Sequence, residues 1–407
     1  MTALSAIADW IVAAGLAGES EAALLDGFCR RALAAGLPIA LAGVIIDTLH
    51  PTYEGRAFRW RRDDAGEPEL LEYGPTNEGE AAAAWQASPF YRLLQSGDSV
   101  LRHRLSGDDP NSTAGLRVEA RGMTEYVVVI NRFAREGAIG EMDCVYSYWI
   151  TDRPDGFADG DVERLVALLP PLALAVKCAS LTRIAGTLVE TYLGRDPGRR
   201  VLAGRIGRGA AEPIHAVLWY SDLHDFTRIA DTSPPRHLMA LLNDYAEAVI
   251  SAIHDHDGDV LKLIGDGVLA IFSYDGDSAA ACASAIAAER ALRQRVNALN
   301  KKRAVKGLPA TEVYLALHIG EVFYGNIGSR ERLDFTVIGP AVNEVARIAA
   351  MCRSADRDVL LSADFAAALA VAVAIPPVSI GRYALRGVAR PQELFTLDRT
   401  TEEPRAG

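Results

Sequence analysis

The sequence lacks the cysteine patterns that mark disulfide frameworks and zinc ribbons. Five cysteines are spread over 407 residues, and no two of them form a CxxC pair, the spacing on which zinc ribbons depend. We therefore expect free thiols, buried in the protein and kept in a reducing compartment. These cysteines are Cys29, Cys144, Cys178, Cys282 and Cys352.

Basic residues are outnumbered. The 42 lysines and arginines face 53 aspartates and glutamates, which gives a formal net charge of −11. Nucleic acids and anionic membranes bind basic surface. We therefore expect no nucleic-acid partner and no membrane partner, while a small basic pocket for a phosphate ligand remains compatible with this charge.

Long apolar runs and targeting signals are missing as well. Residues 1–9 lack the basic flank and the apolar stretch of a signal peptide. The most apolar run, Leu165–Val176, is bounded by charged residues and interrupted by Pro170 and Pro171. A bilayer span needs about 20 apolar residues, so we expect a cytoplasmic protein without a transmembrane segment.

The sequence does contain ample material for globular cores, with 50% hydrophobic and 23% charged residues. Its length fits two or three domains. The character of the chain changes twice, and this predicts a first domain over residues 1–178, a helical connector over 179–212 and a second domain over 213–400. Strands alternate with helices in the second domain, which predicts a fold of the α/β (α+β) class.

The first domain is predicted to place a helix, a mixed antiparallel sheet and a long exit helix in that order. This order resembles the GAF/PAS type of sensory domain, which implies a regulatory role and an unknown small-molecule or protein input. Five aromatic residues either line a ligand pocket in this domain or, as is more common on such a sheet, fill its core. They are Trp60, Trp85, Phe90, Tyr91 and Trp149.

The connector carries a narrow apolar stripe at spacings of 3, 4 and 4 residues. Such a stripe packs two helices in a parallel dimer, or packs one ordinary helix on its own domain. Both interpretations stay open, and the segment 194–198, rich in glycine and proline, is expected to stop the helix. The stripe consists of Leu181, Ile184, Leu188 and Tyr192.

Two aspartates of the second domain are predicted to meet. The strand 215–221 leads into Asp222, and two further strands flank the tight turn that contains Asp266. If these strands are neighbours, ~4.8 Å apart, the two carboxylates share one small site. Adjacent carboxylates repel unless a cation lies between them, and paired Mg²⁺ or Mn²⁺ ions are their usual partners in phosphoryl chemistry. The alternatives are a helix cap at Asp222 and an ordinary turn at Asp266.

Four sequence blocks, in order, resemble the class III nucleotidyl cyclase catalytic domain. They are SDLHDFT at 221–227, LKLIGDG at 261–267, HIGEVFYGNIG at 318–328 and FTVIGPAVNEVAR at 335–347. The resemblance implies a ferredoxin-like βαββαβ fold. It also implies a head-to-tail homodimer whose shared active sites lie at the interface.

The resemblance further implies how metal and purine are bound. Asp222 and Asp266 align with the aspartates that hold two Mg²⁺ or Mn²⁺ ions, and the carbonyl of Leu223 is an added metal ligand. Lys262 and Thr336 align with the residues that read the purine. Members that form cyclic GMP usually carry glutamate and cysteine at these two positions, so this pair favours ATP.

The remaining implied roles concern the ribose and the phosphates. Asn343 and Arg347 align with the catalytic residues that orient the ribose and stabilise the transition state, and their i, i+4 spacing puts them on one helix face. The loop with Phe226 and Thr227 is implied to wrap the phosphates. Arg386 is implied to reach the triphosphate, with Arg390 as the competing candidate.

The sequence thus predicts an adenylate cyclase that converts ATP to 3′,5′-cyclic AMP and pyrophosphate under control of the first domain. Two alternatives remain: a catalytically weak or inactive nucleotide-binding regulator, and a guanylate cyclase. One residue departs from the family pattern, because Asp225 occupies a position where glycine is usual. Its carboxylate is expected either to repel ATP or to bind metal, with lower activity or stronger Mn²⁺ dependence.

Overall fold

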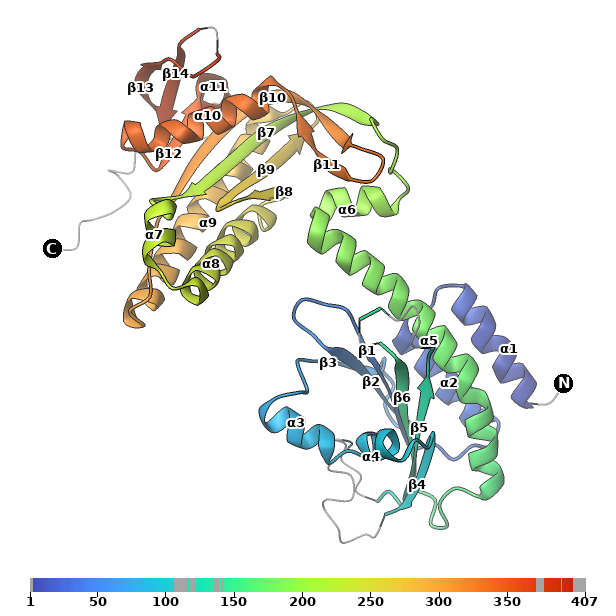
Figure 1. Cartoon of the computed structure of the whole chain (residues 1–407). Helices are drawn as coiled ribbons and strands as arrows, with labels where there is room; N and C mark the ends of the chain where they lie inside the picture. The colour runs from blue at the N-terminus through green and yellow to red at the C-terminus, as the bar shows by residue number, and fades with distance from the viewer. Residues whose placement is uncertain are drawn as a thin grey trace. The chain divides into compact units, whose positions relative to one another are not determined.

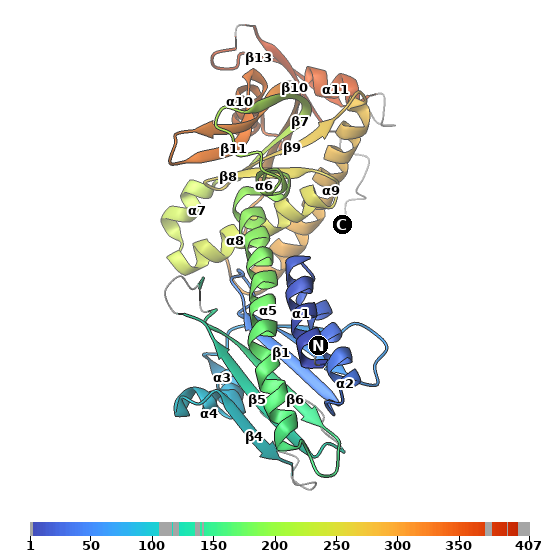
Figure 2. The same cartoon turned by 90° about the vertical axis from the view of Figure 1, so that its right-hand side faces the viewer.

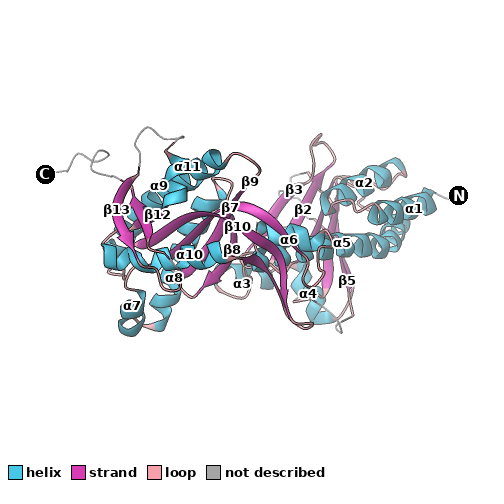
Figure 3. Cartoon of the chain, turned by 90° about the horizontal axis from the view of Figure 1, so that it is seen from above, coloured by secondary structure: helices cyan, strands magenta, loops and turns pink. Residues whose placement is uncertain are grey.

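The chain forms two compact units, Met1–Leu188 and Val189–Gly407, in this computed structural model (Figure 1). The structure describes residues 3–105, 116, 122–134, 139–140, 142–370, 377–388 and 390–397, so the ends of the expected domains at 1–2 and 398–400 lie outside the described residues. Each unit mixes helices with a sheet (Figure 3). The predicted α+β class is confirmed.

Unit 1 is built on a six-stranded sheet with the strand order β3-β2-β1-β6-β5-β4. All neighbouring strands are antiparallel, with Val44 opposite Phe58 on one side and Ser147 on the other. β-branched and aromatic residues dominate its central strands, as expected for a buried pleated surface. The strands are β1 (Leu41–Asp47), β2 (Gly55–Arg61), β3 (Glu69–Tyr73), β4 (Val100–Arg104), β5 (Glu125–Arg132) and β6 (Cys144–Thr151).

Helices cover both faces of this sheet (Figures 1 and 2). One face packs against α1 (Ala3–Leu16), α2 (Glu21–Ala34) and α5 (Asp159–Leu193), and the other against α3 (Gly79–Gln86) and α4 (Pro89–Ser96). Ser20 caps α2 by accepting a hydrogen bond from the amide of Ala23. The larger core lies on the first face, where the rings of Phe28 and Trp149 are 5.1 Å apart.

The five aromatic residues considered as pocket lining do not share one face. Trp60 and Trp149 are buried beneath α1, α2 and α5. Phe90 and Trp85 pack on the opposite side of the sheet, and Tyr91 contacts Trp85. The interpretation as one pocket is therefore wrong for this set, because the sheet lies between the two strand tryptophans and the three aromatic residues of α3 and α4.

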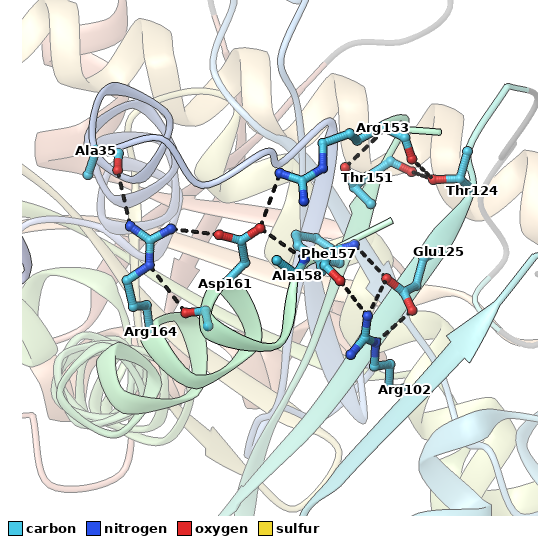
Figure 4. Close-up of polar contacts among 11 residues, drawn as sticks. Ala35, Arg102, Thr124, Glu125, Thr151, Arg153, Phe157, Ala158, Asp161 and Arg164 are labelled. Atoms are coloured by element: carbon cyan, nitrogen blue, oxygen red, sulfur yellow. Dashed lines mark hydrogen bonds and ion pairs between the residues drawn. The ribbon is translucent and has the colours of Figure 1, made fainter. Parts of the chain in front are cut away.

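The start of α5 is held by a cluster of buried polar groups (Figure 4). The carboxylate of Glu125 accepts hydrogen bonds from Arg102 (2.6 Å) and from the amide of Phe157 (2.6 Å). Asp161 accepts from the amide of Ala158 (3.0 Å) and from Arg164 (2.6 Å). The cluster fixes the point at which the chain leaves the sheet and enters the helix.

The apolar stripe lies on α5 itself, which continues without a break to Leu193. Ile184 is 1% exposed, and Leu181 and Leu188 pack against the core of unit 1. Only Tyr192, 80% exposed, lies open to solvent. These contacts favour an ordinary helix packed on its own domain over a free dimer seam.

α5 is also long and apolar enough to cross a bilayer by length and composition alone, with a mean hydropathy of 1.8 in its most apolar window. Of that window, 44% is buried inside the protein, as in the core helix of a soluble domain. The helix is weak evidence for a membrane span, and the absence of membrane contact stays a prediction.

Unit 2 is organised around the strand order β10-β7-β9-β8, in which all neighbours are antiparallel. This is the order of a ferredoxin-like βαββαβ fold, and the predicted topology is confirmed. β12 and β14 extend the sheet beyond β10, and β11 pairs with the far end of β10. The strands are β7 (Ala211–Leu223), β8 (Asp259–Ile264), β9 (Gly267–Tyr274), β10 (Val313–Gly328), β11 (Leu333–Ile338), β12 (Val359–Ser362), β13 (Val378–Tyr383) and β14 (Gln392–Thr396).

Helices flank the sheet of unit 2 on two sides. α8 (Pro235–His254), α9 (Ser278–Val305) and α11 (Ala363–Leu369) pack on one face, and α10 (Pro340–Ala355) on the other (Figure 1). A short helix, α7 (Phe226–Thr232), follows β7 directly.

The segment 194–198 only partly behaves as expected. α5 ends before Gly194, which takes a φ of +93°. A new helix, α6 (Arg195–Leu202), then begins at once and buries Pro197 and Gly198, so these two residues do not act as breakers. Proline is tolerated there because the first turn of a helix does not need its N–H group.

All five cysteines are free, and four of them are buried as expected. Cys178 is the exception, since it is exposed on α5.

We predict that Phe28→Ala destabilises unit 1 by about 3–5 kcal/mol, the usual cost of removing a fully buried aromatic ring. Native-state hydrogen exchange at the amides of β6 measures this loss directly. Val12→Ala on α1, where the side chain is 55% exposed, is the matched control and should change stability by less than about 0.5 kcal/mol. Equal effects of the two substitutions would contradict this account of the core.

Candidate active site

Two aspartates approach each other at one edge of the unit 2 sheet. β7 carries Asp222 next to its last residue, and β8 and β9 are joined by the two-residue turn Gly265-Asp266. β7 pairs directly with β9, with Ser221 opposite Val268. Gly265 takes a φ of +65°, the conformation that a tight hairpin turn needs at its first central position. The expectation that the first strand lies beside the hairpin is confirmed.

A single amide links the two carboxylates. The N–H of Leu223 donates to Oδ1 of Asp222 at 3.1 Å and to Oδ2 of Asp266 at 3.2 Å. Gly267 allows this approach, since a Cβ at that position would lie 3.0 Å from the carbonyl oxygen of Ser221 and 3.6 Å from Oδ1 of Asp222. The local backbone therefore holds both side chains at one point.

The pair is electrostatically costly in the absence of a cation. Burial, together with the hydrogen bond to Asp266 and the repulsion by its charge, raises the pKa of Asp222 to about 7, against the opposing effect of the Leu223 amide. Two carboxylates that share a site commonly shift in this way. A bound cation would remove the repulsion and favour the ionised form.

The donor set fits magnesium or manganese. Within the described ranges, no cluster of three or more His, Cys, Asp or Glu side chains is present that could hold a metal ion, so Asp222 and Asp266 form a two-carboxylate site. Mg²⁺ is commonly bound by one or two carboxylates that are completed by water and substrate phosphates. The carbonyl of Leu223 as a third protein ligand stays a prediction.

The residues assigned to the purine lie on neighbouring strands. Lys262 is on β8 and Thr336 is on β11, which runs alongside β8. The ammonium group of Lys262 forms an ion pair with Asp334, two residues before Thr336. Both side chains of this ion pair are half exposed, so both are accessible to a ligand from solvent.

Asn343 and Arg347 project from α10. Ala341, Val345 and Ile348 form the buried side of this helix, which leaves Asn343 exposed and Arg347 partly exposed. The helix begins at Pro340 after Gly339, as expected for a proline in the first turn.

Arg386 belongs to a turn that packs against Arg347. Gly387 takes a φ of +71°, and a Cβ there would lie 3.3 Å from Nη2 of Arg347. Arg386 thus directly precedes a glycine that adjoins the Arg347 guanidinium, and two guanidinium groups would suit a multiply charged anion. The choice between Arg386 and Arg390 stays a prediction.

Phe226 and Thr227 open α7, directly behind the loop that leaves β7. Asp225 precedes them with a φ of +52°, and its carboxylate pairs with Arg353 at 3.2 Å. Their implied role in wrapping phosphates stays a prediction.

The implied site residues fall into separate groups within one chain. In the part of the chain that the structure describes, no hydrogen bond or ion pair joins Asp222 or Asp266 to Asn343 or Arg347. The two metal-binding candidates are held by the β7–β9 edge, whereas the two catalytic candidates stand on α10.

Two neighbours of these groups were missed from the sequence: Asp334 and Arg353. A further neighbour, His318 on β10, is buried, and its Nε2 lies 3.1 Å from Oε2 of Glu344, the residue after Asn343. Nδ1 of His318 is buried without a hydrogen-bond partner. No sequence signal links such pairs, since they join different elements.

Comparison with known proteins bears on residues 211–398, which match the family model of the adenylate and guanylate cyclase catalytic domain. The chain is 27% identical over 172 residues to "Adenylate cyclase 1" of Rhizobium meliloti, covering 42% of this chain and 26% of that protein. It is 30% identical over 154 residues to "Adenylate cyclase" of Anabaena cylindrica, covering 38% and 30%. The chain thus spans about a third or less of the length of these relatives.

Solved structures with a similar arrangement include the adenylyl cyclase CyaB from P. aeruginosa, with a TM-score of 0.43, 21% identity and coverage of 47% of this chain and 98% of that chain. The guanylyl cyclase Cya2 has a TM-score of 0.40 and 23% identity, and the match covers 46% of this chain and 92% of that chain.

The family match covers all four of the blocks noted in the sequence and does not extend into unit 1, where the resemblance to GAF/PAS domains stays a prediction. Residues 211–398 of this chain are thus similar to the adenylate and guanylate cyclase catalytic domain.

Proposed function

We propose that the protein is an adenylate cyclase, which converts ATP to 3′,5′-cyclic AMP and pyrophosphate. The observation that carries this proposal is the convergence of Asp222 and Asp266 on the amide of Leu223, within a domain of the cyclase family. In the reaction, the ribose 3′-oxygen bonds to the α-phosphorus while the bond from that phosphorus to the pyrophosphate oxygen breaks.

Asp222 and Asp266 would hold Mg²⁺ or Mn²⁺, two ions per site. Such ions lower the pKa of the 3′-hydroxyl and neutralise the triphosphate. One amide already holds the two side chains together. The free-energy cost of their repulsion therefore arises on folding rather than during the reaction. Phe226 and Thr227, at the start of α7, would lie along the phosphates.

Lys262 and Thr336 would select adenine. A lysine donates to the N1 acceptor of adenine, and a threonine hydroxyl accepts from its amino group. The ion pair with Asp334 limits the positions open to the Lys262 ammonium group. This pairing supports ATP rather than GTP as the substrate.

Asn343 would orient the ribose and Arg347 would stabilise the charge that develops at the phosphorus. The planar, permanently charged guanidinium suits phosphate oxygens, and Arg386 would add a second positive charge from the neighbouring turn. No side-chain nucleophile is needed, because positioning and charge neutralisation dominate phosphoryl transfer.

The protein would act as a head-to-tail homodimer in the cytoplasm. The carboxylate pair and the α10 residues stand on different elements of one chain, and the resemblance to the cyclase family suggests that each site draws on two chains. Unit 1, proposed as a GAF/PAS-like regulatory domain, would pass an unknown small-molecule or protein signal through α5 and α6 to the catalytic unit.

We predict that the purified full chain with Mn²⁺ forms cyclic AMP and pyrophosphate from ATP, and forms little product from GTP. Chromatography of the nucleotides and a pyrophosphate assay measure both products. Turnover of GTP alone would identify a guanylate cyclase. Nucleotide binding without product from either substrate would identify an inactive regulator.

A second prediction concerns the shared site. Asp222→Ala and Arg347→Ala should each lower turnover at least about 100-fold, as loss of a transition-state contact does. Mixed in equal amounts, the two variants should recover about a quarter of the wild-type rate, because half of the dimers contain one intact site. A mixture of Asp222→Ala with Asp266→Ala is the matched control and should recover nothing. Absence of rescue in the first mixture would argue against the dimer.

A third prediction uses the raised pKa of Asp222. The folded state favours the protonated carboxyl, so this stabilisation is complete below the unfolded value near 3.8 and is lost as the pH rises through about 7. In EDTA, Asp266→Asn removes the repulsion, and its melting temperature should exceed that of the wild type by roughly 2–4 °C more at pH 8 than at pH 5.

The matched control for this measurement is Asp275→Asn, at an exposed turn, which should show no such trend. Excess Mn²⁺ at pH 8 should raise the melting temperature of the wild type and leave that of Asp266→Asn unchanged. Parallel pH curves for the wild type and Asp266→Asn would show that the two carboxylates do not interact.

A further inference from the structure

The loop between the carboxylate pair and α7 contains a residue in a conformation that favours glycine. Asp225 takes a φ of +52°, in the left-handed region that aspartate tolerates better than most residues. The backbone of the loop therefore has a conformation that glycine adopts easily. The residue at this position nevertheless carries a third carboxylate, three residues after Asp222. Where this carboxylate points determines whether it disturbs a polyanionic substrate.

The Asp225 carboxylate is engaged by two arginines and a histidine and not by the metal-binding pair. Its Oδ1 lies 3.2 Å from Nη2 of Arg353, and its Oδ2 lies 3.7 Å from Nδ1 of His224 and 3.8 Å from Nε of Arg228. Its side chain is only 25% exposed. The Asp222 carboxylate, by contrast, contacts the Leu223 amide and Asp266.

The position of Asp225 on the loop is consistent with these contacts. Its side chain lines an open cavity of about 280 Å³ beside α7, together with His224, Arg228 and Thr311. Asp222 and Asp266 do not belong to the lining of this cavity. The third carboxylate thus faces a different side of the loop from the two that gather at Leu223.

Arg353 differs from the other two neighbours. His224 and Arg228 belong to the same loop and to α7, whereas Arg353 comes from the last turn of α10. Its side chain is 76% exposed, and exposed ion pairs contribute little to stability. A contribution to global stability therefore does not account for this contact, and its effect on the direction of the Asp225 side chain is the remaining role.

We propose that Arg353 is a positioning residue, which holds the Asp225 carboxylate away from the metal-binding pair so that a loop with aspartate in place of glycine still accepts a triphosphate. This inference rests on the proposed function. In this proposal α10 carries Asn343 and Arg347 and also positions the loop residue Asp225. The Asp225 carboxylate then has a role other than metal binding.

The test is a double-mutant cycle on the full chain, with D225G, R353Q and the combination of both. R353Q should raise the KM for ATP in Mg²⁺ roughly three- to tenfold, the range typical of contacting residues, with a smaller change in kcat. In the same variant, the ratio of activity in Mn²⁺ to activity in Mg²⁺ should also rise, because an Asp225 carboxylate that is no longer paired with Arg353 becomes an additional metal ligand. R353K, which keeps the charge, should restore part of the loss.

In the D225G background, R353Q should have no effect, since there is no carboxylate left to misplace. R357Q is the matched control, at an arginine just past α10 whose guanidinium donates to the carbonyl of Asp356, and it should leave KM and the metal ratio unchanged. A purely structural role of Arg353 would lower stability in both backgrounds and leave the metal ratio unchanged.

Affinity for Mn²⁺ with a non-hydrolysable ATP analogue is measured on the same variants. This binding measurement distinguishes failure of the present proposal from failure of the proposed function. If the wild type makes no cyclic nucleotide, the proposed function is overturned, but the affinity for Mn²⁺ still tests the role of Arg353. Equal effects of R353Q with and without Asp225, or no effect at all on affinity, would overturn the proposal.

Discussion

The repulsion between two carboxylates is the constraint on which the site depends. Asp222 and Asp266 are 44 residues apart in the chain, yet the pairing of β7 with β9 and the hairpin between β8 and β9 bring them to one amide. Such an arrangement persists only because the surrounding sheet is stable enough to impose it. A divalent cation would turn this local cost into binding energy, and the proposed phosphate chemistry would follow from that conversion.

The basic side chains of unit 2 do not form ion pairs with Asp222 or Asp266 in the part of the chain that the structure describes. Lys262 is matched with Asp334 and Arg353 with Asp225. Arg347, in contrast, adjoins Gly387, the residue after Arg386, and both arginines are proposed to meet the anion. The overall charge of −11 therefore does not conflict with an anionic substrate, because the relevant positive charge is local.

The carboxylate pair could be predicted from the sequence because its signals are local: a strand that ends in aspartate and a hairpin with Gly-Asp-Gly at its turn. The same patterns indicated alternating strands and helices in unit 2, and the βαββαβ order came from the resemblance to the cyclase family. The partners of Lys262 and Asp225 could not be predicted, since each contact joins elements far apart in the chain. In unit 1 the aromatic residues were pooled without regard to face. Trp149 on β6 packs in the core beneath α1, α2 and α5, whereas Phe90 belongs to α4, which packs on the opposite side of the sheet.

The most direct test of the account is a count of bound Mn²⁺ by electron paramagnetic resonance, in the presence of a non-hydrolysable ATP analogue. The account predicts two ions per site in the wild type, and loss of ion binding when Asp222 and Asp266 are both replaced by asparagine. Unchanged stoichiometry and affinity in that double variant would place the metal elsewhere and contradict the central claim.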